Sequence, residues 1–238
     1  MELTLHRPPP SKLCLAHHFL QYDLRQLGNR FKRRLTGQQV KYIAENKYAM
    51  PDSELSQKAL AFTRECSPDF LLNHCLRSHA FAVALAAEMK LRFDPEILFI
   101  GSILHDLGLT ERCADNDTFE LSGARAARSF CQTTGMDSQR SDLIHEMVAL
   151  HNAIGIADTR EAEIALLHFG AGADVIGLHL KDIHPRTLRE IISRYPRENF
   201  SEAMAELIQK QIEQKPKSYM STMVRMGFLN KMQALSLD

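Results

Sequence analysis

The sequence lacks a net charge, because its 29 Lys and Arg residues are balanced by 29 Asp and Glu residues. Such a balance gives no long-range attraction toward nucleic acid or an anionic membrane. The charges are uneven along the chain, since residues 1–50 hold nine basic and three acidic residues, which leaves 9 − 3 = +6 there and −6 in the remainder. The short run Arg30-Phe31-Lys32-Arg33-Arg34 is typical of solvated surface. Without an aromatic platform beside it, we do not expect it to bind nucleic acid or a membrane.

A disulfide framework and a membrane span are absent as well. The five cysteines are an odd number and include no C-x-x-C pair, a pattern that fits a reducing compartment. No apolar run reaches the length of a membrane span, and none near residue 1 precedes a small-residue cleavage site. We therefore expect a cytoplasmic protein.

Alternation of apolar and polar residues with a period of two, the mark of half-buried strands, is missing too. Residues 51–238 instead carry helical periodicity and helix-forming residues, which predicts an all-α fold with a single domain there. Asp94 and Pro95 predict a helix start, and Gly108 predicts its end. Ser201 is the expected cap of a later helix that ends before Pro216. Residues 1–50 are expected to form a basic N-terminal extension, partly helical or flexible, with a helix near residues 22–34. The expected helices of the domain cover 70–90, 94–108, 119–135, 141–151, 161–180, 185–195 and 201–214.

Four polar residues stand out because their surroundings in the sequence are apolar. His105 and Asp106 follow seven apolar residues in "EILFIGSILHD", and His74 lies in "LLNHCLRSHAF". Asp174 is the lone acid of "HFGAGADVIGL", so its partner must come from another helix. A buried carboxylate without compensation costs several kcal/mol. Either a neighbouring histidine or arginine or a metal ion can supply that compensation, and two imidazoles with two carboxylates suit Zn, Fe or Mn.

The order His74, His105-Asp106, Asp174 on successive helices resembles the H…HD…D signature of the HD-domain metal-dependent hydrolase superfamily. The segments "NHCLRSHAFA", "ILHDLGLT", "FELSGARAA", "VALH", "GAGADVIG" and "YPRENF" look like the branch that contains cyanamide hydratase. The resemblance covers residues 51–230. It implies a helical HD-domain bundle in which His74, His105, Asp106 and Asp174 bind one divalent metal ion, with Zn favoured and Fe, Mn or Ni as alternatives.

Three further residues have candidate roles at such a site. His151 in "MVALHNAIG" matches a position where many HD enzymes carry another histidine, so a catalytic or substrate-binding role is expected. Glu120 in "TFELSGA" is either a carboxylate beside the substrate or an acid favoured by a helix N-terminus. Arg77 is either a substrate contact or the structural partner of a buried acid. His145 and His168 are present, but neither is assigned to a second metal.

Three hypotheses for function remain open at this point. The first is a hydrolase or hydro-lyase in which a metal-activated water attacks a small molecule, as in the conversion of cyanamide to urea, with Asp106 handling the water's proton. The second is a phosphohydrolase acting on a nucleotide or another phosphate ester. That hypothesis is weakened because Arg77 is the basic residue close to the motifs, with Lys181 and Arg186 further along. The third is a non-catalytic binding protein with an HD fold. The expected partner is a small-molecule substrate, and a homodimer is compatible with the sequence.

Overall fold

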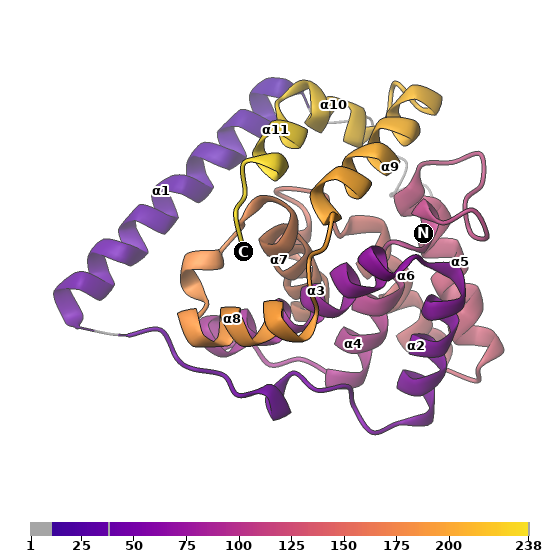
Figure 1. Cartoon of the computed structure of the whole chain (residues 1–238), viewed down its shortest axis with the longest axis horizontal. Helices are drawn as coiled ribbons and strands as arrows, with labels where there is room; N and C mark the ends of the chain where they lie inside the picture. Colours follow the sequence, from indigo (N-terminus) through magenta and orange to yellow (C-terminus); the bar gives the residue numbers. More distant parts are fainter. Residues whose placement is uncertain (1–10, 38, 238) are drawn as a thin grey trace.

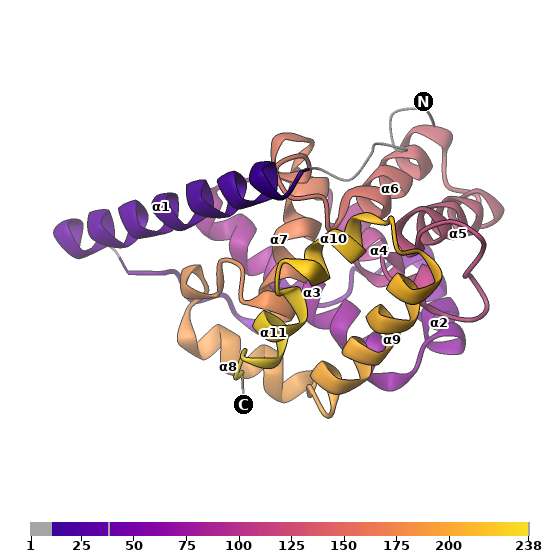
Figure 2. The ribbon, with the colours of Figure 1, turned by 90° about the horizontal axis from the view of Figure 1, so that it is seen from above.

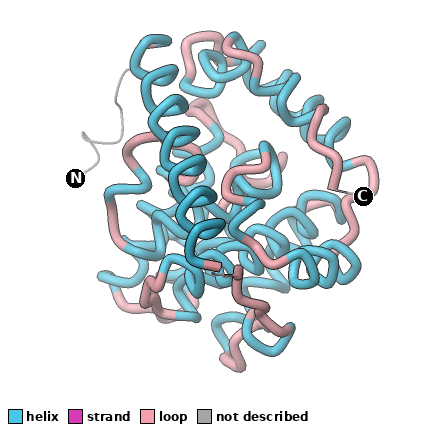
Figure 3. The backbone as a smooth tube through the Cα atoms, turned by 90° about the vertical axis from the view of Figure 1, so that its left-hand side faces the viewer, coloured by secondary structure: helices cyan, strands magenta, loops and turns pink. Residues whose placement is uncertain are grey.

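A computed structural model describes residues 11–37 and 39–237, apart from the side chains of Asp23, Arg25, Asn29 and Arg30. Within these ranges all regular structure is helical and no strand occurs (Figure 3), which confirms the prediction of an all-α fold. In the same part of the chain, no helix is both long enough and apolar enough to cross a membrane.

The chain folds as a succession of helices that are mostly 10 to 25 residues long. After the N-terminal helix α1 and a short 3₁₀ turn, the remaining helices follow one another with short connections. Their bounds are α1 (Lys12–Thr36), η2 (Glu45–Lys47), α2 (Glu54–Cys66), α3 (Asp69–Met89), α4 (Pro95–Leu104), η3 (Leu107–Leu109), α5 (Phe119–Thr133), α6 (Ser138–Leu150), η4 (Ala157–Thr159), α7 (Ala162–Ile176), η5 (Leu180–Asp182), α8 (Pro185–Arg194), α9 (Phe200–Gln214), α10 (Tyr219–Arg225) and α11 (Phe228–Gln233).

Helix α3 is the central element, with α4 and α7 packed along it and α8 and α9 on its outer side (Figure 1). Almost every residue between Leu71 and Ala86 is buried, which is why this helix has apolar or small residues on all faces. The approach of α7 is close because Gly170 has no side chain: a Cβ atom there would overlap the backbone oxygen of Ser78. Gly170 therefore sets the distance between the two helices at this point.

Helix α4 begins as predicted but ends earlier. The Asp94 carboxylate caps the helix by accepting hydrogen bonds from the amides of Glu96 and Ile97, at 2.9 and 3.2 Å. The last helical residue is Leu104, so the prediction that Gly108 ends the helix is wrong. Gly108 lies in η3 instead, where a Cβ atom would overlap the backbone oxygen of Phe119 in α5. Glycine is needed there for close packing rather than for a left-handed helix cap.

The other predicted helices of the domain are present, but the helix predicted over 161–180 ends at Ile176, where Gly177 in a left-handed conformation (φ +74°) follows it, and the start of α9 also differs. That helix begins at Phe200, and Asn199 in a left-handed conformation (φ +53°) precedes it, so Ser201 is not its cap. Helix α5 ends near Gly135, whose φ of +87° explains the glycine at that turn. The boundary predicted near residue 50 falls between η2 and α2.

The N-terminal helix α1 is longer than the predicted segment 22–34 and has two different faces. Arg33 fixes one face to the rest of the chain through ion pairs of 2.8 Å with Glu88 and Asp182, and Leu15 is fully buried. The opposite face leaves large apolar side chains in solvent, at Leu13, Leu20, Leu24, Leu27, Phe31 and Leu35. The C-terminal half of α1 extends past the other helices (Figure 2). Residues 1–10 of the predicted extension lie outside the described residues.

Candidate metal centre

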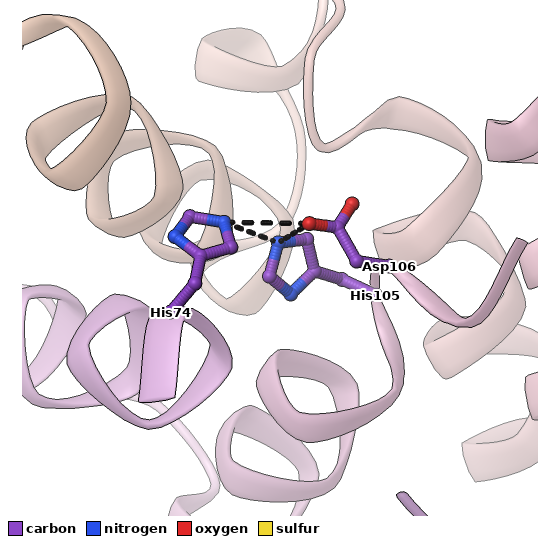
Figure 4. A group of neighbouring side chains, drawn as sticks. All are labelled: His74, His105 and Asp106. Carbon is purple, nitrogen blue, oxygen red and sulfur yellow. Dashed lines mark hydrogen bonds and ion pairs between the residues drawn. The ribbon is translucent and has the colours of Figure 1, made fainter. Parts of the chain in front are cut away.

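His74, His105 and Asp106 form a buried cluster where α3 passes the end of α4. His74 comes from the middle of α3, while His105 is the residue that follows the last turn of α4. Nε2 of His74 lies 3.2 Å from Nε2 of His105, and each of these nitrogens lies 3.4 Å from Oδ2 of Asp106. The side chains point toward one another (Figure 4), and their ligand atoms could hold one metal ion.

Two histidines are oriented by the same local device at the ends of two helices. His105 follows α4 and His151 follows α6, and in each the ring Nδ1–H donates to the carbonyl three residues earlier, that of Ser102 or Val148, at 2.7 Å. The last carbonyls of a helix have no partner within the helix, so each ring satisfies one of them. Because Nδ1 carries the proton, Nε2 of each ring is left with a lone pair for a ligand. The negative ends of both helix dipoles also face this region, which favours a cation.

His74 is oriented by Asp174, which comes from α7. Nδ1 of His74 lies 2.7 Å from Oδ2 of Asp174. Burial raises the pKa of Asp174, but the Arg77 guanidinium and His74 outweigh that effect and hold the pKa well below its usual range. An ionised carboxylate only accepts hydrogen bonds, so Nδ1 of His74 donates the proton and its Nε2 is the ring nitrogen turned toward His105.

The cluster therefore brings three possible metal ligand atoms together. Two imidazole nitrogens and one carboxylate oxygen meet at 3.2–3.4 Å, distances at which a shared proton or a metal ion offsets the repulsion between their lone pairs. A proton on His105 is disfavoured, since burial and then the neighbouring His74 lower its pKa to about 3. Burial, followed by the proximity of His105, also lowers the pKa of His151 to about 4. A metal ion satisfies all three acceptors at once.

Asp174, the fourth predicted ligand, does not belong to this cluster. Its carboxylate lies on the Nδ1 side of His74, away from the ring nitrogen that faces His105. Both of its oxygens are occupied: Arg77 donates through Nε and Nη2 at 2.8 and 2.9 Å, and Arg197 donates through Nη1 at 2.6 Å. The structure thus joins three of the four predicted ligands and gives Asp174 the part of an orienting group behind His74.

Arg77 is the structural partner of a buried acid, Asp174, which is one of the two roles considered for it from the sequence. Its side chain is fully buried, and its remaining nitrogen donates to the carbonyls of Tyr195 and Pro196 at 3.0 and 2.8 Å. With these donors engaged, Arg77 holds Asp174 and the segment before α9 in place. It does not line the cavity described below, so the expectation of a substrate contact is not met.

His151 and Glu120 lie on the same side of the cluster. Nε2 of His151 is 3.7 Å from Oδ1 of Asp106, the carboxylate oxygen not shared with His74 and His105. Glu120 is buried and accepts a hydrogen bond of 2.6 Å from Asn152, while its second oxygen has no hydrogen-bond partner. Burial raises the pKa of Glu120. Glu120 therefore lies behind Asn152 rather than on the wall that a substrate would touch.

A cavity of about 280 Å³ opens beside the cluster, and His74, His105, Asp106 and His151 all form part of its wall. His168 also lines it and donates from Nδ1 to the carbonyl of His151 at 2.8 Å. A ligand in this cavity would lie next to the atoms that could hold a metal.

Two residues of the site were missed by sequence reasoning. Asn152 lines the cavity, and a repeated pattern marks it: "LHD" at 104–106 and "LHN" at 150–152 both follow the last turn of a helix. Arg197 donates to the carboxylate and the carbonyl of Asp174. It belongs to the quoted segment "YPRENF", but nothing in one sequence shows which buried acid an arginine 23 residues away will reach.

Comparison with known proteins adds no assignment: no protein-family model matches the chain, and no curated protein is significantly similar to it. The resemblance to the HD-domain superfamily stays a prediction from the motifs.

Proposed function

We propose that the protein is a metal-dependent hydrolase or hydro-lyase of the HD-domain type, related to the branch that contains cyanamide hydratase. One observation supports this proposal above the others: the buried ligand atoms of His74, His105 and Asp106 converge at 3.2–3.4 Å on the wall of a cavity. One metal ion would bind all three atoms, and the contact of the cluster with a cavity would give that ion access to a substrate.

Zinc is the ion that we propose for the cluster. Imidazole nitrogens and carboxylate oxygens are ligands that zinc binds, and distances of 3.2, 3.4 and 3.4 Å between them would let one ion contact all three. Three protein ligands beside a cavity are typical of catalytic rather than structural zinc. When bound, the ion would lower the pKa of a coordinated water toward neutrality.

The surrounding residues then divide the work between orientation and proton transfer. Asp174 and the carbonyl of Ser102 fix the two ligand imidazoles, so that both present Nε2. Oδ1 of Asp106 faces His151, and this pair is placed to accept and pass on a proton from water entering at the cavity wall. Glu120 holds Asn152, whose side chain would contact a substrate. In the hydration of a nitrile, the water oxygen would bond to carbon and both water protons would end on nitrogen.

The proposal is tested by a paired activity screen after reconstitution with zinc. Urea release from cyanamide and amide formation from larger nitriles are measured beside phosphate release from a nucleotide panel. Zinc-dependent turnover that disappears in Asp106→Asn supports a metal-dependent enzyme, and the product identifies the reaction. Phosphate release alone would replace the hydration reaction with the phosphohydrolase alternative. Silence on both panels with zinc bound would favour the non-catalytic alternative and count against the proposal.

A further inference from the structure

The cavity beside the cluster has a lining that discriminates between substrate classes. Its volume of about 280 Å³ lies near the lower end of the range for small-molecule sites, about 300–1,000 Å³. Cyanamide, with three non-hydrogen atoms, would occupy a small part of this space and leave the rest of the apolar wall unfilled.

Most of the wall is apolar and comes from four separate parts of the chain. Phe119 lies at the start of α5, Phe169 lies in α7, and Met204 lies in α9, while Met220 and Met223 come from α10. Methionine side chains are flexible and polarisable, so they adapt to an apolar surface of irregular shape. Helix α1 also contributes to the wall, with Phe19 and Tyr22 beside the polar residues His18, Gln21 and Gln26. A ligand here would contact mostly apolar side chains.

No positive charge from lysine or arginine reaches the cavity among the side chains that the structure describes. The ionisable carboxylates of the wall are Asp106 and Asp158, which repel anions. The nearest buried guanidiniums, those of Arg77 and Arg197, are directed at Asp174 behind His74. An anionic group such as a phosphate that filled the apolar part would lose its hydration without gaining a partner, at a cost of several kcal/mol.

Polar groups line more than one part of the wall. His74, His105, Asp106, His151 and Asn152 line it at the metal end, and His18, Gln21, Gln26, Asp158 and His179 line it elsewhere, whereas methionine, phenylalanine and aliphatic side chains cover most of the remainder. We infer that the cavity binds an uncharged substrate with a largely apolar body and small polar groups, which is larger than cyanamide and carries no phosphate. The statement that this ligand is a substrate rests on the proposed function. The preference of the cavity for an apolar, uncharged ligand follows from its lining alone.

The preference can be measured with two probes that differ by one charged group. N-phenyl-1-naphthylamine is neutral, and 1-anilinonaphthalene-8-sulfonate has the same aromatic body with one sulfonate. We expect the full-length protein to bind the neutral probe one to one, at least tenfold more tightly than the sulfonate, as followed by fluorescence titration. Val175→Trp would fill the cavity and weaken binding of the neutral probe at least tenfold. Ala61→Trp, on the exposed side of α2, is the matched control and should leave it unchanged.

Several results would overturn the inference. These are equal or tighter binding of the sulfonate, no binding of the neutral probe, or unchanged binding in a folded Val175→Trp variant. If that variant does not fold, Ile154→Trp from another part of the wall gives the same test. Titrations are made with zinc and with a chelator, and zinc binding is measured on the same samples. Loss of zinc binding with the probe preference intact would contradict the proposed function, whereas zinc binding with a preference for the sulfonate would contradict the substrate class.

Discussion

Replacing Asp174 by asparagine should mainly reduce stability, whereas replacing Asp106 by asparagine should mainly reduce metal binding, although the chemical change is the same. Asp174 is fully buried and accepts hydrogen bonds from Arg77, Arg197 and His74. Asp174→Asn would leave two buried guanidiniums without their counter-charge, and breaking a buried pair of this kind costs about 3–5 kcal/mol. Asp106 lies 3.4 Å from Nε2 of His74 and of His105, and replacing it leaves no buried guanidinium unpaired, so Asp106→Asn should cost the metal-free protein less stability than Asp174→Asn.

The order of effects reverses for metal binding. Asp106→Asn removes a proposed ligand and should abolish tight zinc binding. Asp174→Asn removes only the group that orients His74, and loss of such a partner lowers metal affinity about 10–100-fold. Urea unfolding followed by circular dichroism in the presence of a chelator gives the stabilities, and zinc titration of the folded proteins gives the affinities. The reasoning is refuted if Asp174→Asn unfolds like the unmodified protein, or if Asp106→Asn loses stability to the same extent.

Three further predictions concern other parts of the fold. Burial lowers the pKa of His79 to about 3, so below the unfolded value near 6.5 the unfolded chain binds a proton that the folded chain does not. The free energy of unfolding should therefore fall from pH 6 to pH 4 by about 2–3 kcal/mol on account of this residue. In urea unfolding, His79→Leu should reduce this pH dependence. An unchanged pH dependence would contradict the lowered pKa of His79. Gly108→Ala would force a methyl group against the backbone oxygen of Phe119 and should cost about 1–3 kcal/mol in thermal or urea unfolding, whereas a neutral effect would mean that η3 moves freely. Arg33→Met removes both ion pairs that Arg33 makes, and it should raise amide hydrogen exchange in α1 but not in α3. Equal protection in both proteins would show that other contacts hold α1 in place.

The sequence predicted the start of a helix where the signal is local. Asp94 and Pro95 mark the start of α4 by a cap and by a fixed φ, and both act within one turn of the chain. The end of α4 was missed because Gly108 serves a contact with α5, which periodicity cannot reveal. The start of α9 at Phe200 was missed for a related reason, since Asn199 in a left-handed conformation replaces the expected serine cap.

The residues of the candidate site could be predicted from the sequence. Which of them converge on one point, and which only orient a neighbour, could not. An isolated acid in a small-residue helix required a cationic partner from elsewhere, and Asp174 has such partners in Arg77 and Arg197. From the sequence, an arginine, a histidine or a metal ion could each compensate the charge of a buried carboxylate. The structure separates the two acids: His105 and Asp106 lie on the Nε2 side of His74, and Asp174 lies on its Nδ1 side.

The most direct test of this account is the zinc content of the purified protein after equilibrium dialysis, compared with His105→Ala and with the control His17→Ala on the exposed side of α1. The account predicts one zinc ion per chain in the unmodified protein and in the control, and close to none in His105→Ala with its circular dichroism unchanged. An unmodified protein that binds no zinc, iron, manganese or nickel, or a His105→Ala variant that keeps its metal, would contradict it.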